Sequence, residues 1–274
     1  MKRKWIVYPY ILWMVFFVIL PVLLVFLQSI VKINGASYVF TLDNLKRVFE
    51  PLYLRVIYRS IKLAMMSTFI CLILGYPVAA IIASWDLKHN SSMITWFIIP
   101  MWINFLARTY AWVALLEKHG IIESIIKSLG FAPLDLLYTQ NAVIVGMVYN
   151  FLPFMILPIY SALMKIDRSH IEAASDLGAH PLVVFLKVVL PKSFSGVMSG
   201  VNMVFMPALT TFVISRLLGG GQYMLLGNLI EQQFLTTRDW GFGAALSMVL
   251  IMFILISMFL MSKYEDEGGE GKIW

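Results

Sequence analysis

Six long apolar runs constrain the fold of this chain more than any other feature of its sequence. Their approximate limits are residues 6–30, 61–84, 94–116, 141–164, 194–215 and 242–262. A helix rises about 1.5 Å per residue, so roughly 20 apolar residues cross a hydrocarbon core of about 30 Å. Each run reaches that length. The sequence therefore predicts an all-α integral membrane protein with about six transmembrane helices, arranged as a single transmembrane domain over residues 1–274.

Composition also favours a membrane protein over a soluble one. Hydrophobic residues make up 60% of the chain and charged residues only 13%, whereas about 25% of the residues of a soluble domain are charged. The formal net charge is +6, and most of the 21 basic residues lie in the connections between the apolar runs. There they flank spans and can contact anionic lipid head groups. We therefore expect membrane lipid, and not nucleic acid, as their partner.

The charges of the connections do not settle the orientation of the chain. An even number of spans places both termini on one side, and Lys2, Arg3 and Lys4 favour the cytoplasm for the N-terminus. However, residues 43–59 are also basic and amphipathic, which suits a segment lying along the membrane surface. The first run is too long for a signal peptide and lacks a cleavage site, so it is interpreted as a retained span. The polar tail 263–274 is expected to be mobile.

Sequence patterns for covalent chemistry are missing from the chain. It contains no GxxxxGK[ST] loop for the phosphates of ATP. The four histidines and the one cysteine, Cys71, have no metal-ligand spacing. No nucleophile elbow and no pair of acids within the apolar runs is present. We therefore expect a transport protein without catalytic residues, metal site or cofactor, rather than an enzyme.

The connection between the fourth and fifth runs, residues 165–192, predicts ordered structure. Ser169 with Glu172 three residues later is a capping box, which places a helix start near Ser169. Gly178 suits the end of that helix, and Pro181 suits the first turn of a second one. On these residues alone, the result is either an ordinary helical hairpin or a surface on which another protein docks.

A longer pattern in this connection carries a resemblance. Glu172-Ala173-Ala174 is followed by three residues, Gly178, nine residues and then Val188-Val189-Leu190-Pro191. This resembles the cytoplasmic EAA loop of bacterial ABC importer permeases, Glu-Ala-Ala, three residues, Gly, nine residues, Ile-x-Leu-Pro, with Val188 in place of Ile. The resemblance implies that the first helix of the loop is a coupling helix that docks on an ATPase. The residues that it implies for coupling are Glu172, Ala173, Ala174, Asp176, Gly178, Leu190 and Pro191.

The same resemblance implies the partners and the location of the chain. The partners would be a cytoplasmic ATP-binding subunit, a second homologous permease that forms a heterodimer with this chain, and an extracytoplasmic solute-binding protein. Because the loop is cytoplasmic in that family, both termini would be cytoplasmic in a multi-pass protein of the bacterial cell membrane.

Shorter motifs over nearly the whole chain are similar to those of the spermidine/putrescine permeases of this family, and they imply a polyamine cargo. They are Phe40-Thr41-Leu42-Asp43-Asn44, Gly75-Tyr76-Pro77, Arg108-Thr109-Tyr110, Leu152-Pro153-Phe154-Met155, Gly219-Gly220, Gly227-Asn228, Gln233-Phe234-Leu235, Arg238-Asp239-Trp240 and Gly243-Ala244-Ala245. The alternatives are another cargo, such as a metal-ion complex, an anion or an amino-acid-like solute, and a stand-alone channel or ion-coupled carrier.

A polycation needs acidic or aromatic groups along its route. The apolar runs hold almost no carboxylates, so aromatic and polar side chains are the candidates, although aromatic residues in spans more often serve packing or anchoring. A charge inside a span costs at least about 2.5 kcal/mol, so Arg108 is expected to face the interior, bonded to Asn104 or to helix-end carbonyls. Arg216 stands where polyamine permeases often have an acid, which weakens the polyamine assignment but not the assignment as a transporter. The pathway candidates are Trp102, Asn104, Arg108, Tyr110, Tyr149 and Asn150.

Overall fold

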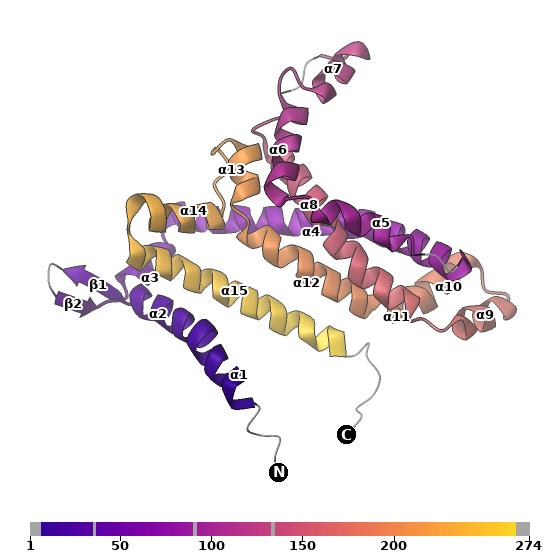
Figure 1. The fold of residues 1–274 in the computed structure, drawn as a ribbon, viewed down its shortest axis with the longest axis horizontal. Helices are drawn as coiled ribbons and strands as arrows, with labels where there is room; N and C mark the ends of the chain where they lie inside the picture. The colour runs from indigo at the N-terminus through magenta and orange to yellow at the C-terminus, as the bar shows by residue number, and fades with distance from the viewer. Residues whose placement is uncertain (1–6, 35–36, 90–91, 133–134, 267–274) are drawn as a thin grey trace.

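The computed structural model describes residues 7–34, 37–89, 92–132 and 135–266, and the fold is given for these residues. Long helices lie beside one another and account for most of the molecule (Figure 1). Residues 1–6 and 267–274, which include the start of the first apolar run and most of the predicted polar tail, lie outside the described residues.

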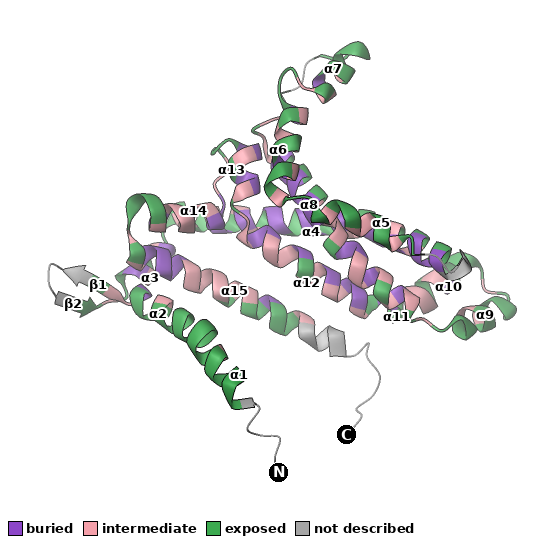
Figure 2. Ribbon diagram, viewed as in Figure 1, coloured by how far each residue is buried: buried purple, intermediate pink, exposed green. Residues whose placement is uncertain are grey.

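The first predicted span is an uninterrupted helical stretch. It consists of α1 (Val7–Met14), a π-helical turn (Val15–Ile19) and α2 (Leu20–Ser29). Nearly all of its side chains are exposed (Figure 2), although they are apolar. Such a surface is compatible with lipid, in which a helix satisfies all of its own backbone groups.

Three further long helices correspond to the second, fourth and sixth runs. They are α4 (Pro51–His89), α8 (Gln140–Met164) and α15 (Trp240–Asp266). At 39 residues, α4 is about 58 Å long and exceeds the hydrocarbon core, so the predicted span 61–84 is only its central part. Among the described residues, four helices are long and apolar enough to cross a membrane, and six spans result if each of two bent pairs is counted as one.

The third run is divided into several helical segments, although its hydropathy is continuous. It begins as α5 (Ile94–Ile98), tightens into a 3₁₀ turn (Ile99–Trp102) and starts again as α6 (Phe105–Leu116), with α7 (Ile121–Ser128) after it. The two halves, 94–102 and 105–128, meet at 90°. Pro100 lacks a backbone donor, and the extended backbone of Ile103 allows the Asn104 side chain to cap a new helix. These two local effects account for the break.

The predicted span 194–215 is also divided. The helix α12 (Phe194–Thr210) ends where Thr211 becomes extended, and α13 (Val213–Gly219) follows. On its other side, α12 forms the second bent pair with residues 181–192, at an angle of 62°.

The connection after the first span contains two strands that hydropathy did not predict. The strands β1 (Val31–Asn34) and β2 (Ser37–Phe40) form an antiparallel hairpin in which Val31 pairs with Phe40. The helix α3 (Asp43–Val48) follows. The segment 43–59, expected to be one amphipathic element, is therefore split between α3 and the first turns of α4.

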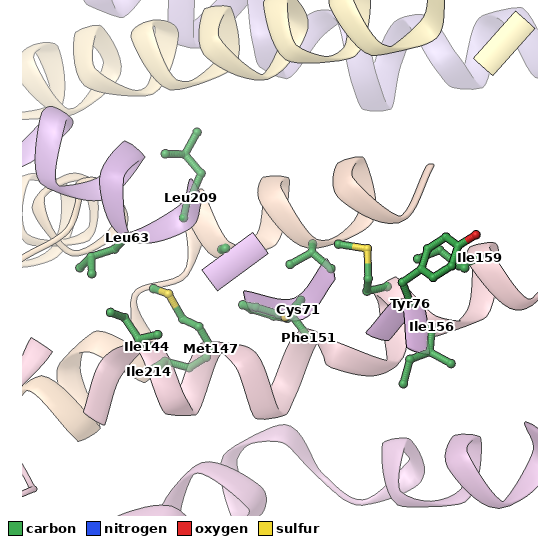
Figure 3. Packing of buried hydrophobic residues seen from close by; sticks show 14 of the residues in the cluster. Leu63, Cys71, Tyr76, Ile144, Met147, Phe151, Ile156, Ile159, Leu209 and Ile214 are labelled. Carbon is green, nitrogen blue, oxygen red and sulfur yellow. The ribbon is translucent and has the colours of Figure 1, made fainter. Parts of the chain in front are cut away.

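The core lies where α4, α8 and α12 pack together (Figure 3). Leu63 and Cys71 of α4, Met147 and Phe151 of α8, and Leu209 of α12 are buried there. Glycines let α12 approach α8 closely, because a Cβ on Gly196 would lie 2.5 Å from Ala162 Cβ and 2.7 Å from Pro158 O. Small residues at a helix contact are the usual means of tight packing in a membrane.

The first prediction tests this contact. We expect Gly196→Val to lower the Tm of the purified protein by at least about 2 °C, because overpacking costs about 1–3 kcal/mol and the obstructing atoms, Ala162 Cβ and the backbone oxygen of Pro158, cannot rotate away. Met203→Val, on the same helix at a side chain that is 53% exposed, is the control and should leave the Tm unchanged. An unchanged Tm for Gly196→Val, measured by thermal unfolding in detergent, would contradict the close packing.

Candidate functional site

The predicted coupling helix is present as α9 (Arg168–Asp176). It starts slightly earlier than the capping box predicts, because Asp167 rather than Ser169 is its N-cap. The Asp167 carboxylate accepts a hydrogen bond of 2.9 Å from the Ser169 backbone N–H. The backbone and side-chain hydrogen bonds of Ser169 hold the pKa of this exposed carboxyl below its usual value. The negative charge at the helix start also complements the positive end of the helix dipole.

Gly178 ends α9, as the sequence predicts. Its φ is +77°, a conformation that side-chain-bearing residues rarely adopt. The Gly178 N–H donates to Ser175 O over 2.9 Å and the Ala179 N–H donates to Ala174 O over 3.1 Å, the paired bonds of a Schellman motif. Pro181 then opens α10 (Pro181–Val184), and His180 Nδ1 caps this helix by accepting a hydrogen bond from the Leu182 N–H. A π-helical turn (Phe185–Val189) and α11 (Leu190–Lys192) complete the loop.

The outer surface of α9 is open to solvent. Glu172, Ala173, Asp176 and Gly178 are exposed, and Ala174 is half-buried. Leu177 was not among the predicted coupling residues, yet its side chain is 87% exposed. An apolar residue directly before the helix-ending glycine is the sequence signal that identifies it. The loop lies at the end of the molecule opposite the β-hairpin (Figure 1).

A largely apolar hollow of about 330 Å³ lies beneath α9. Ala83 of α4, Leu163 of α8, Phe185 of the loop, and Ile171 and Glu172 of α9 contribute to its lining. The helix α9 is therefore not packed tightly onto the ends of the long helices, which leaves room for it to shift against them.

The second half of the loop is attached more firmly. The hydroxyl groups of Tyr76 in α4 and Ser193, just after α11, are 2.7 Å apart and hydrogen-bonded in a buried position. The Tyr76 ring also meets the Phe185 ring edge-on at 5.7 Å. Leu190 is half-buried beside this contact region and Pro191 is exposed. A displacement of the loop would thus act on α4 through Tyr76.

Asp86, a buried acid near the end of α4, links several helices at the end of the molecule that carries the loop 165–192. It is 2% exposed and accepts hydrogen bonds from the Met93 N–H at 2.8 Å and the Tyr160 hydroxyl at 3.0 Å. These bonds join α4 to the start of α5 and to α8. The sequence showed a carboxylate at the end of an apolar run, but not which groups would surround it.

The pathway candidates on α6 and before it have different environments. Trp102 is 82% exposed and Tyr110 is 57% exposed. The Asn104 side-chain oxygen accepts hydrogen bonds from the Leu106 and Ala107 N–H groups at 2.8 and 3.4 Å. The Asn104 side chain therefore acts as a helix cap. The expected bond between the side chains of Asn104 and Arg108, both of which the structure describes, is not formed. Within the described part of the chain, the buried Arg108 Nε has no hydrogen-bond partner.

The two candidates on α8 are adjacent in sequence but differ in burial. Tyr149 is 42% exposed and its ring meets that of Trp112 in α6 at 5.3 Å. Asn150 is 1% exposed and donates to Gly146 O at 2.9 Å. The structure thus joins Tyr149 to α6 through an aromatic pair, and it does not gather all six candidates around one space.

Arg216 is paired with an acid that sequence reasoning missed. Its guanidinium in α13 donates a hydrogen bond to the Glu231 carboxylate in α14 (Leu226–Gln232). Glu231 lies outside the six predicted runs and is therefore not one of the acids expected within a span. The charge that appeared to conflict with a cationic cargo is therefore neutralised by its neighbour.

Comparison with known proteins agrees with this architecture. The family model described as "Binding-protein-dependent transport system inner membrane component" matches residues 2–265. The spermidine/putrescine transport system permease protein PotB of Escherichia coli (strain K12) is 40% identical over 243 residues, covering 87% of this chain and 88% of that protein. The Haemophilus influenzae PotB is 38% identical over 253 residues, covering 90% and 88% of the two chains.

Solved structures share the fold at low sequence identity. A bacterial alginate ABC transporter, in complex with an alginate pentasaccharide-bound periplasmic protein, gives a TM-score of 0.79 at 16% identity and covers 99% of this chain and 98% of its own. An inward-facing MetNI methionine ABC transporter gives a TM-score of 0.56 at 17% identity, with 79% and 96% covered. These structures show a shared fold, whereas the family model and the relatives lead to one conclusion: the chain belongs to the family of inner-membrane components of binding-protein-dependent transport systems.

Proposed function

We propose that this chain is the permease subunit of an ATP-driven importer and that its cargo is a polyamine, spermidine or putrescine. The observation that carries the cargo is the similarity to spermidine/putrescine permeases, which extends over 87% of the chain at 40% identity. Short motifs shared by chance would not cover such a length. Because the chain has no phosphate-binding loop, ATP hydrolysis is assigned to a separate subunit.

The helix α9 is the proposed docking element for that ATP-binding subunit. Ala173 and Ala174 are small enough to let the helix seat closely in a cleft, and Glu172 and Asp176 offer charges to basic groups of the partner. Leu177 adds an exposed apolar contact. Nucleotide-driven movement of the partner would displace α9 over the hollow beneath it and reach α4 through Phe185, Ser193 and Tyr76.

The arrangement of the ends supports a cytoplasmic location for both termini. The start of α1, the end of α15 and α9 all lie away from the β-hairpin (Figure 1). If α9 faces a cytoplasmic ATPase, both termini face the cytoplasm as well. The hairpin, α3 and α14 then face the outside, where a solute-binding protein would deliver the cargo.

A second, homologous permease is the proposed partner within the membrane, because the exposed aromatic side chains of this chain require an opposite wall to form a pathway. Trp102, Tyr110 and Tyr149 offer faces for weak cation–π contacts with ammonium groups. Weak contacts suit a route from which the cargo must depart. A stand-alone channel or carrier would need neither α9 nor its exposed surface.

The cargo is tested by uptake of labelled spermidine and putrescine in cells that lack this chain and then regain it. We expect uptake to fall to background without the chain and to return with it, since the pathway requires this subunit. Alginate oligosaccharide and methionine serve as comparison solutes. Unchanged polyamine uptake, with loss of another solute, would replace the proposed cargo and leave the permease class intact.

The coupling role of α9 is tested by Gly178→Val and Glu172→Lys. Valine at φ +77° strains the backbone and disturbs the end of α9, and lysine reverses a charge on the docking face. We expect both variants to reach the membrane at normal levels, to lose at least tenfold in uptake, and to lose cargo-stimulated ATP hydrolysis in the purified complex.

A matched control for the glycine is available in the same chain. Gly130 ends α7 with φ +83°, and, like Gly178, it has open space around an added Cβ. Gly130→Val therefore imposes the same strain away from the loop and should keep most of the uptake. Glu117→Lys is the charge control on an exposed acid. Equal uptake by the loop variants and their controls would exclude α9 as the coupling element.

A further inference from the structure

A second hollow, of about 400 Å³, lies between α13 and α14, far from the coupling loop. Its volume falls within the range of about 300–1,000 Å³ that is usual for ligand sites. Polar and charged side chains make up much of its lining: Ser215, Arg216, Tyr223, Asn228, Glu231 and Gln232. Under the proposed orientation, the hollow is on the extracytoplasmic side of the core, where cargo enters.

The walls of this hollow are held in place by one amide. The Asn228 Nδ2 donates to Phe212 O over 2.8 Å, while its Oδ1 accepts hydrogen bonds from the Ser215 hydroxyl and the Leu225 N–H. Asn228 thus joins α14 to α13 with both ends of its side chain. The hollow is therefore formed before any ligand arrives, and Asn228 is occupied in holding its walls.

The ion pair at the hollow is unequal in its exposure to solvent. The side chain of Glu231 is only 17% exposed, whereas that of Arg216 is 57% exposed. A mostly buried carboxylate is costly without a cationic partner. The guanidinium can instead return to water and remain near the Phe212 ring, whose centroid is 5.9 Å from Arg216 Cζ. Arg216 can therefore be displaced at a lower cost than Glu231 can be left unpaired.

We propose that Glu231 is a binding site for an ammonium group of the cargo, and that Arg216 occupies the carboxylate until the cargo displaces it. This inference rests on the proposed polyamine function. A protonated amine donates N–H bonds to the Glu231 carboxylate as the guanidinium does, and Tyr223 and Gln232 line the space into which the rest of a linear polyamine extends. Competition from Arg216 keeps the affinity low, so that the cargo is released toward the pathway.

The charge of the hollow disfavours an anion as the ligand. An anion attracted by Arg216 would also face the Glu231 carboxylate at close range, and breaking the pair to reach the arginine would leave that carboxylate buried and unpaired. A cation that replaces the arginine leaves Glu231 neutralised throughout the exchange. The arrangement therefore selects a cationic ligand.

The test compares Glu231→Gln with Arg216→Gln in cells that express the complete transporter, with the KM for labelled spermidine as the readout. If Glu231 binds the cargo, E231Q raises the KM at least tenfold, because the carboxylate is lost. R216Q removes the competitor and lowers the KM several-fold. Glu50→Gln, on an exposed acid at the same end of the molecule, leaves the KM unchanged. Equilibrium dialysis of spermidine with the purified transporter should show the same order of affinities.

The opposite signs separate binding from a structural ion pair. A pair that only stabilises the fold predicts that E231Q and R216Q lose transport together, and that result, or an unchanged KM in both, overturns the proposed site. If E231Q does not accumulate in the membrane, Gln232→Lys replaces it: a cation added to the hollow should raise the KM, and an unchanged KM again overturns the site. Absence of spermidine uptake and binding by the wild-type transporter overturns the polyamine cargo itself, and with it the ligand assigned to Glu231.

Discussion

The structure depends on the requirement that backbone polar groups in a bilayer be bonded within the protein. This requirement turns the long apolar runs into helices, and it also decides where they can be interrupted. The chain leaves the helical path at residues 103–104 and 211–212, and each break has its own compensation. Asn104 caps α6, and Asn228 accepts a bond from Ser215 and donates one to Phe212 O beside the second break. The placement of Asn104, a pathway candidate, and of Asn228 at the second hollow is therefore partly a consequence of interrupted helices.

The helix α4 connects the two ends of the molecule to which functions are proposed. At one end its Tyr76 bonds to Ser193 of the loop, and toward the other its Ser60 hydroxyl accepts a buried hydrogen bond of 2.8 Å from the Leu226 N–H of α14. Between these contacts α4 packs against α8 and α12 in the core. A helix of this length, held at both ends, is a continuous physical connection between the coupling loop and the hollow at Glu231. In the proposed mechanism, movement of the loop changes the geometry at which the cargo is bound.

Sequence reasoning succeeded where a single local property decides the structure. Hydropathy located the long helices, Gly178 ended α9 because of its positive φ, and Pro181 began α10. It was less exact where two local signals compete: Asp167, and not Ser169, caps α9, and the hydropathy of the third run is continuous across the break before Asn104. The β-hairpin was missed because its strands are short and their pairing depends on neighbours outside an apolar run. Asp86 and Glu231 were visible as acids, but their partners come from other helices.

Arg216 shows why a residue's charge has limited meaning before its neighbours are known. As an isolated residue it argues against a polycationic cargo, since like charges repel. Paired with Glu231 it contributes no net charge, and its greater exposure makes it the member of the pair that can move away. The same residue that disfavoured a polyamine in the sequence thus becomes, in the fold, a means of keeping a carboxylate available without leaving it unpaired. A permease that must bind and then release a cation needs such a replaceable partner more than it needs a free acid.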